Sequence, residues 1–280
     1  MGIWVSGGNA LGAYGGRALG RVALAPLAGA GALCVGGRDV YCSAEGDMLW
    51  RLDARSLQPR ALFAGGPCMR DVCISADGRR LYALLSGADS VLMLDAADGA
   101  PLMLARAGCN PPRMALDDAA QVLAIAGGRQ EAVILLDAHT LSLIREMPMP
   151  GPVCAVAAAA GCVMALCMTG ERRSALAVCG RDVRFCALSG RPGALLARER
   201  GALAATKEAL FACTPKAQCR RLGRLSGCPS RMAADGDRLV WIDSFREAAM
   251  CLDRSGAGVR TLCAPASGLG AYTFLPTKPT

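Results

Sequence analysis

The chain has 280 residues, of which 53% are hydrophobic and 4% aromatic, enough for one large domain or two small ones with an aliphatic core. Its formal net charge is +8, but the arginines are scattered singly or in pairs with few aromatic residues, which argues against nucleic-acid binding. No apolar stretch is long enough to cross a bilayer and the first residues do not resemble a secretory signal, so we expect a cytoplasmic protein that is not bound to a membrane.

One sequence phrase recurs along the chain at a nearly constant spacing. "LWRLDARSL" contains Asp53, "VLMLDAADG" contains Asp95 and "AVILLDAHT" contains Asp137, so successive aspartates are 42 residues apart. Each carboxylate is predicted to accept backbone N–H groups two or three residues later and so to close a turn. Weaker copies mark the equivalent place at Gly15, Ala187, Gly223 and Asp253. This period predicts a repeat architecture.

Each repeat also contains the pattern of a β-hairpin upstream of its marker. Examples are "CISADGRRLYALL" (73–85), "MALDDAAQVLAIA" (114–126) and "RMAADGDRLVWID" (231–243), in which two apolar runs flank a short turn. The repeated phrase supplies a third strand, and "APLMLARAG" or "LSLIREMPM" supplies a fourth. Four short strands cannot bury both faces of their sheet alone, so the units are predicted to stack radially as a β-propeller.

The repeat count predicts a single all-β domain over residues 1–280, a seven-bladed β-propeller with four antiparallel strands per blade. The N-terminal unit lacks a first strand, so we expect a C-terminal strand to pair with the N-terminal strands and close the ring. A longer hairpin is expected at 169–174, within the least regular unit. The predicted blades are 1–29 plus 264–276, 30–66, 67–108, 109–151, 152–200, 201–228 and 229–263.

The segment "GCNPPRMALDDAAQVLAIAGGRQEAVILLDAHTLSLIREM" resembles the YVTN-type β-propeller repeats. The shared features are a glycine, a proline shortly after it, a turn between two strands and the phrase around the repeated aspartate. The Tyr-Val-Thr-Asn tetrad itself is absent from this chain. The resemblance implies a propeller and says almost nothing about chemistry, because propellers carry many unrelated functions.

No catalytic residue, metal site or cofactor is predicted. The one histidine, His139, lies in the turn of "LDAHT", and no G-x-S-x-G or C-x-x-C-H motif occurs. The 15 cysteines include no C-x-x-C pair, so we interpret them mainly as small apolar residues in a reducing compartment.

One set of residues suggests a binding site. Cysteines recur where one unit passes to the next, and in three units an arginine follows closely; these entry loops are expected to meet at the mouth of the central channel. We predict a monomeric, non-catalytic binding platform for a protein partner or a small anionic ligand. The alternatives are a propeller-type hydrolase or lactonase using channel-lining Asp and Arg, a thiol-based metal or redox site, and cysteines that merely fill space. The predicted ligand-binding residues are Arg70, Arg113, Arg231, Cys68, Cys109 and Cys228.

Overall fold

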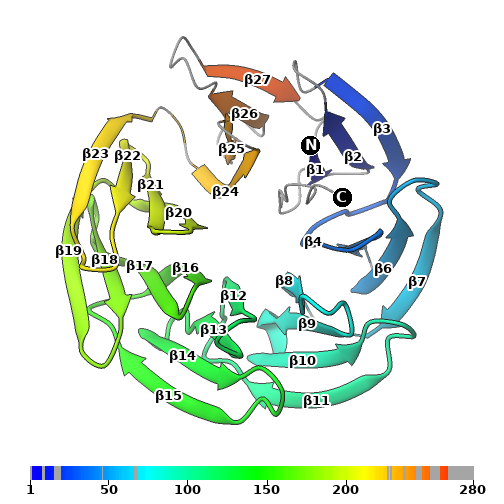
Figure 1. Ribbon diagram of the computed structural model, residues 1–280, viewed down its shortest axis with the longest axis horizontal. Coiled ribbons are helices and arrows are strands. Elements are labelled where there is room, and N and C mark those ends of the chain that lie inside the picture. The colour runs from blue at the N-terminus through cyan, green and yellow to red at the C-terminus, as the bar shows by residue number, and fades with distance from the viewer. Residues whose placement is uncertain are drawn as a thin grey trace.

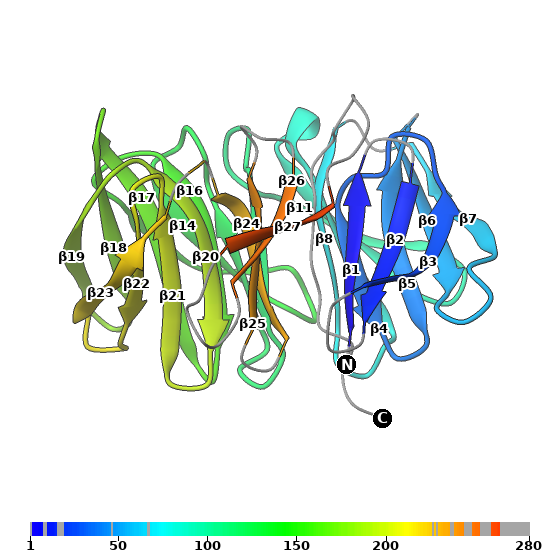
Figure 2. The ribbon, with the colours of Figure 1, turned by 90° about the horizontal axis from the view of Figure 1, so that it is seen from above.

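The computed structural model describes residues 2–7, 10–15, 20–45, 47–65, 68–225, 227, 229–235, 238–243, 248–252 and 259–263. Its strands form antiparallel sheets arranged radially about a central channel, as in a β-propeller (Figure 1). Seen from the side, the sheets stand next to one another in a disc whose strands run from one face to the other (Figure 2). Within the described ranges no helix is long and apolar enough to span a membrane.

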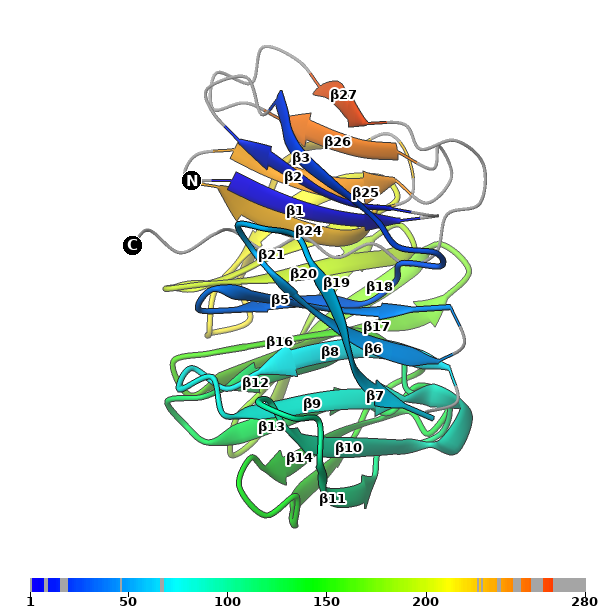
Figure 3. The same ribbon diagram turned by 90° about the vertical axis from the view of Figure 1, so that its right-hand side faces the viewer.

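Six sheets contain four strands each, paired in chain order from the inner strand to the outer strand. Figure 3 shows several of them stacked along one side of the disc. Their bounds are β4 Leu33–Gly36, β5 Asp39–Ala44, β6 Met48–Asp53 and β7 Pro59–Ala64; β8 Met69–Ile74, β9 Arg80–Leu85, β10 Ser90–Asp95 and β11 Pro101–Arg106; β12 Met114–Asp117, β13 Val122–Ala126, β14 Ala132–Asp137 and β15 Leu143–Pro148; β16 Val153–Ala159, β17 Cys162–Gly170, β18 Arg173–Cys179 and β19 Val183–Ser189; β20 Pro192–Arg198, β21 Gly201–Thr206, β22 Ala209–Cys213 and β23 Cys219–Arg224; β24 Pro229–Asp235, β25 Arg238–Asp243, β26 Ala248–Leu252 and β27 Val259–Cys263.

The prediction of seven four-stranded blades is wrong, because the described residues form six blades of four strands. The remaining N-terminal sheet has three strands, β1 Gly2–Gly7, β2 Ala10–Gly15 and β3 Gly20–Pro26, in the order β1-β2-β3. Its three described strands pair as consecutive antiparallel hairpins, with a register shift between Ala13 and Tyr14 of β2. The expected closing strand, residues 264–276, lies outside the described residues.

One blade boundary also differs from the prediction. Residues 152–200 were expected to form one blade, but β20 pairs with β21 of the next sheet rather than with β16–β19. The chain leaves β19 at Gly190, whose φ of 87° is readily adopted only by glycine, and turns into the next inner strand. The expected longer hairpin at 169–174 is present, since β17 has nine residues and turns into β18 at the exposed Glu171.

The repeated aspartates close the turns as predicted. Asp53 Oδ1 accepts the backbone N–H groups of Arg55 and Ser56 at 3.0 and 2.8 Å. Asp137 Oδ1 accepts those of His139 and Thr140 at 2.9 and 2.8 Å. These hydrogen bonds favour the carboxylate and lower the pKa of both aspartates. The turn in which the histidine lies is exposed, as the sequence indicated.

The alanines that follow Asp95 and Asp137 connect neighbouring blades. Ala96 and Ala138 are buried, and each carbonyl accepts a hydrogen bond from a tyrosine of the preceding blade. Tyr82 Oη donates to the Ala138 oxygen at 2.6 Å, and Tyr41 Oη donates to the Ala96 oxygen at 3.4 Å. The buried aliphatic side chains of adjacent sheets pack together around these contacts. The core is therefore a series of layers between blades, with the inner strands left to line the channel.

Candidate functional site

A cavity of about 580 Å³ occupies the channel between the inner strands. Its described walls come from β4, β8, β12, β16, β20 and β24, so it is the central channel of the propeller rather than a gap inside one blade. Most wall residues are small or aliphatic. The charged residues among them are Asp71, Asp118, Arg113 and Arg231.

Three of these charges occupy equivalent places in their blades. Equivalent positions can be found from the second strand of each four-stranded blade. The fifth residue of that strand lies opposite one residue of the innermost segment, either as its partner in the sheet or through a backbone hydrogen bond. Equivalent residues of a propeller lie at one level around the channel. We call this level the charged tier. Its members are Ala32, Asp71, Arg113, Ala155, Ala194 and Arg231.

An ion pair crosses the channel within the charged tier. Arg231 Nη1 lies 2.9 Å from Asp71 Oδ1, although the two residues are 160 positions apart in the chain. Their side chains are 13% and 5% exposed, so the pair is largely shielded from water. Arg231 Nη2 also donates to the carbonyl oxygen of Arg70 at 3.2 Å.

Asp71 is held by hydrogen bonds besides the ion pair. Its Oδ2 accepts the backbone N–H of Met114 in the next blade at 3.0 Å, and its Oδ1 accepts that of Val72 at 3.2 Å. Both carboxylate oxygens therefore have donors. Asp71 acts as an anchor between blades that also orients the guanidinium of Arg231.

Arg113 has no carboxylate partner among the described residues. Its Nη1 donates to the Pro112 carbonyl at 2.7 Å, and its Nη2 donates across the channel to the Ser230 carbonyl at 3.4 Å. Burial and the neighbouring positive charge of Arg231 lower the pKa of Arg113 to about 9, against the opposing effect of Asp71. The surroundings thus disfavour this cation, because its guanidinium is withdrawn from water and lies near the like charge of Arg231. Within the described chain, Arg231 Nε is also buried without a hydrogen-bond partner.

The predicted site residues divide into two groups. Arg113 and Arg231 line the cavity and meet in the charged tier, whereas the Arg70 side chain is exposed and contributes its carbonyl oxygen. Cys68 is exposed and Cys109 is partly buried; both lie in the entry loops, and neither lines the cavity. Cys228 lies outside the described residues.

Sequence reasoning did not single out Asp71. The residue follows Arg70 directly in "CMRDV", but its role depends on the register between strands of different blades. The same applies to Cys34 and Cys73, which line the cavity from adjacent inner strands. Burial raises the pKa of both thiols, and the negative charge of Asp71 adds to this effect. Neutral thiols are therefore part of the apolar wall beside the charged tier.

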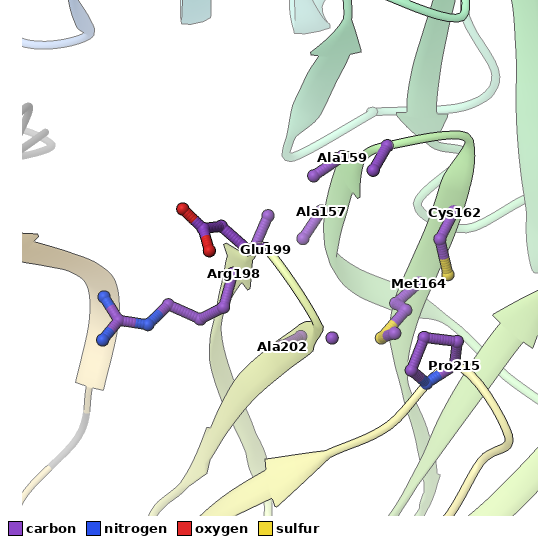
Figure 4. A pocket seen from close by; sticks show the side chains of 11 residues that line it. Ala157, Ala159, Cys162, Met164, Arg198, Glu199, Ala202 and Pro215 are labelled. Atoms are coloured by element: carbon purple, nitrogen blue, oxygen red, sulfur yellow. The ribbon is translucent and has the colours of Figure 1, made fainter.

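A second, smaller cavity of about 70 Å³ lies between two neighbouring blades (Figure 4). Its lining includes Cys162, Met164 and Pro215, and Figure 4 shows the side chains of Arg198 and Glu199 directed away from these apolar groups. The volume suits a few water molecules rather than a ligand. Across the residues that the structure describes, no three His, Cys, Asp or Glu side chains are grouped so as to hold a metal ion.

The chain matches no protein-family model and no curated protein. It is similar in structure to a functionally unknown protein from Desulfotomaculum acetoxidans, with a TM-score of 0.77 and 11% identity over 98% of this chain and 99% of that one. It is also similar to the β-propeller domain of Cps50 (Swd1) from Myceliophteria thermophila, with a TM-score of 0.72 and 15% identity over 87% and 88% of the two chains. BamB from Moraxella catarrhalis gives a TM-score of 0.60 at 12% identity over 83% and 76%.

Likenesses at such low identity show the fold alone. The narrower resemblance to YVTN-type repeats therefore stays a prediction, since no family model matches the chain. The radial sheets and these structural likenesses agree on the architecture: the chain is an all-β propeller.

Proposed function

We propose that the protein is a non-catalytic binding platform whose central channel binds a small anionic ligand. The observation that carries this proposal is Arg113, a guanidinium that faces the channel with no carboxylate partner among the described residues. A cation withdrawn from water is costly unless an anion compensates it. A ligand with a carboxylate or phosphate group would supply that charge and accept hydrogen bonds from arginine.

The size and the walls of the cavity support a small ligand. A volume of about 580 Å³ falls within the range of sites for small molecules. Aliphatic groups such as Val72, Leu116 and Leu196 line the remainder, so the ligand is expected to carry an apolar part next to its anionic group.

Replacing Arg113 with Met is expected to weaken anion binding about 10- to 100-fold, since one charge-assisted hydrogen bond contributes about 1.5–3 kcal/mol. Calorimetric titration with inorganic phosphate and with citrate measures this change. The matched control is Arg106→Met, which removes the same charge from the exposed end of the outer strand β11.

The fold of the Arg113→Met variant is expected to be at least as stable as the wild type. The substitution removes a partly buried cation that has no ion pair among the described residues and leaves the Arg231–Asp71 pair intact. Thermal denaturation distinguishes lost binding from lost structure. Equal affinity of the wild type and Arg113→Met for both anions would contradict the proposal.

A hydrolase or lactonase is the second candidate, and the close approach of Asp71 and Arg231 in the channel favours it. Asp118 also lines the cavity, and its Oδ2 accepts the Ala76 N–H. Because Asp71 is paired with Arg231, Asp118 is the cavity carboxylate that would act on a substrate. If this candidate is correct, turnover of a panel of lactones and esters falls at least about 100-fold in Asp118→Asn. The absence of turnover by the wild type would rule it out for those substrates.

A further inference from the structure

Three thiols meet near the outer rim of the propeller, away from the central cavity. Cys186 lies on β19, the outer strand of one blade, while Cys213 on β22 and Cys219 on β23 belong to the next blade. Figures 1 and 2 both show β19 and β23 next to each other at this rim. The Cys219 and Cys213 sulfurs are 3.2 Å apart, and the Cys186 thiol is hydrogen-bonded to Cys219.

The backbone suits a bond between Cys213 and Cys219. The two residues are directly paired across the antiparallel strands of one hairpin. The Thr214 N–H donates to the Gln218 carbonyl oxygen at 2.9 Å, so Thr214 and Gln218 form a hydrogen-bonded pair. Hydrogen-bonded and non-hydrogen-bonded pairs alternate along antiparallel strands, so the adjacent pair, Cys213–Cys219, is non-hydrogen-bonded. Such pairs have Cα atoms about 4.5 Å apart, which lies within the range that a disulfide spans.

The two thiols also differ in access to solvent. Cys213 is 4% exposed, whereas Cys219 and Cys186 are partly exposed. A dissolved oxidant therefore reaches Cys219 first, and the buried sulfur of Cys213 is already in contact with it. Exposed arginines flank this position at Arg184, Arg220 and Arg221, which favours the approach of an anionic oxidant.

We propose that Cys213 and Cys219 form a thiol–disulfide exchange site that is oxidised by small anionic disulfides such as oxidised glutathione. The Cys219 thiolate attacks one sulfur of the small disulfide, forms a mixed disulfide and releases one small thiol. The Cys213 thiolate then attacks Cys219 Sγ, forms the Cys213–Cys219 bond and releases the second small thiol. Two protein thiols are oxidised and one small disulfide is reduced to two thiols, so electrons and protons balance.

Peptide mapping tests this directly, because trypsin places the three cysteines in different peptides. Cys213 lies in 208–216, Cys219 in 217–220 and Cys186 in 185–198, where the Arg191–Pro192 bond resists cleavage. The folded protein is incubated with oxidised glutathione, its free thiols are alkylated, and the digest is analysed by mass spectrometry. We expect peptide 208–216 to be linked to 217–220 in the wild type.

Two variants serve as the mechanistic test and the control. In Cys213→Ser this link is lost, and Cys219 retains glutathione or pairs with Cys186, its other neighbouring thiol. In Cys68→Ser, which removes an exposed cysteine of an entry loop, the link forms as in the wild type. The proposal is overturned if Cys219 in the wild type stays free, keeps glutathione, or pairs with any cysteine other than Cys213.

The pH dependence tests whether the first step is attack by a thiolate. The hydrogen bond to Cys213, and burial as the next cause, raise the pKa of the Cys219 thiol above its ordinary range. Only a small fraction of Cys219 is then thiolate at neutral pH. As long as the pH stays below this pKa, each rise of one pH unit increases the thiolate fraction about tenfold. We expect the rate of formation of the link to rise with pH in this way. A rate that does not change between neutral and mildly alkaline pH would contradict attack by Cys219.

Discussion

Replacing Arg231 with Met is expected to lower the free energy of unfolding by about 3–5 kcal/mol. The substitution removes the cation paired with Asp71 and leaves a carboxylate that is 5% exposed without its counterion. The two backbone N–H groups that remain on Asp71 do not compensate its charge. Chemical denaturation followed by circular dichroism measures the change.

The more solvent-accessible ion pair between Arg51 and Asp39 provides a matched control. Its N–O distance is 2.7 Å, but its side chains are 31% and 21% exposed. Arg51→Met is therefore expected to cost about 0–1 kcal/mol, as is typical of surface ion pairs. The double variant Arg231→Met with Asp71→Asn should regain much of the lost stability, because the unpaired charge is gone. Equal costs at Arg231 and Arg51 would show that the channel pair is not shielded from water.

The second large effect is expected at Tyr82, whose side chain is 1% exposed between two blades. Tyr82→Ala should cost about 3–5 kcal/mol, because it leaves a cavity in a layer packed by both sheets. Tyr82→Phe removes the hydroxyl group alone and should lower the free energy of unfolding by about 1–3 kcal/mol, since the Ala138 carbonyl loses its 2.6 Å hydrogen bond.

The equivalent tyrosine of the preceding blade is the control for this hydroxyl. Tyr41 Oη lies 3.4 Å from the Ala96 oxygen, so its hydrogen bond is weaker and Tyr41→Phe should cost less than Tyr82→Phe. Urea denaturation of both variants gives the comparison. A larger cost at Tyr41 would mean that the contact between blades does not depend on these hydroxyl groups.

Much of the fold could be predicted from local patterns. Short apolar runs such as those of β9 and β10, together with the aspartate turns, depend on contacts within one hairpin and recur visibly in the sequence. The errors arose where strand order depends on distant packing. β20 follows β19 after a short turn, and no local pattern indicates that it pairs with β21 and not with β19.

The candidate site could be predicted only in part. Arg113 and Arg231 were identified because they follow blade-entry cysteines in the sequence, but Cys109 does not line the cavity with them, and Cys228 lies outside the described residues. Asp71, the partner of Arg231, was missed, because this ion pair joins residues 160 positions apart. The thiols of Cys186 and Cys219 likewise come from different blades.

The sequence by itself determined the strands, their turns and the repeat, because short apolar runs and carboxylate-capped turns act over a few neighbouring residues. The tertiary structure alone decided which charges meet. Stacking the blades around a channel brings one level of every inner strand together, and there Arg231 pairs with Asp71 while Arg113 is left without a carboxylate partner among the described residues. That encounter, and the thiol cluster at the rim, depend on the spacing between blades, which is set by the side chains packed between neighbouring sheets.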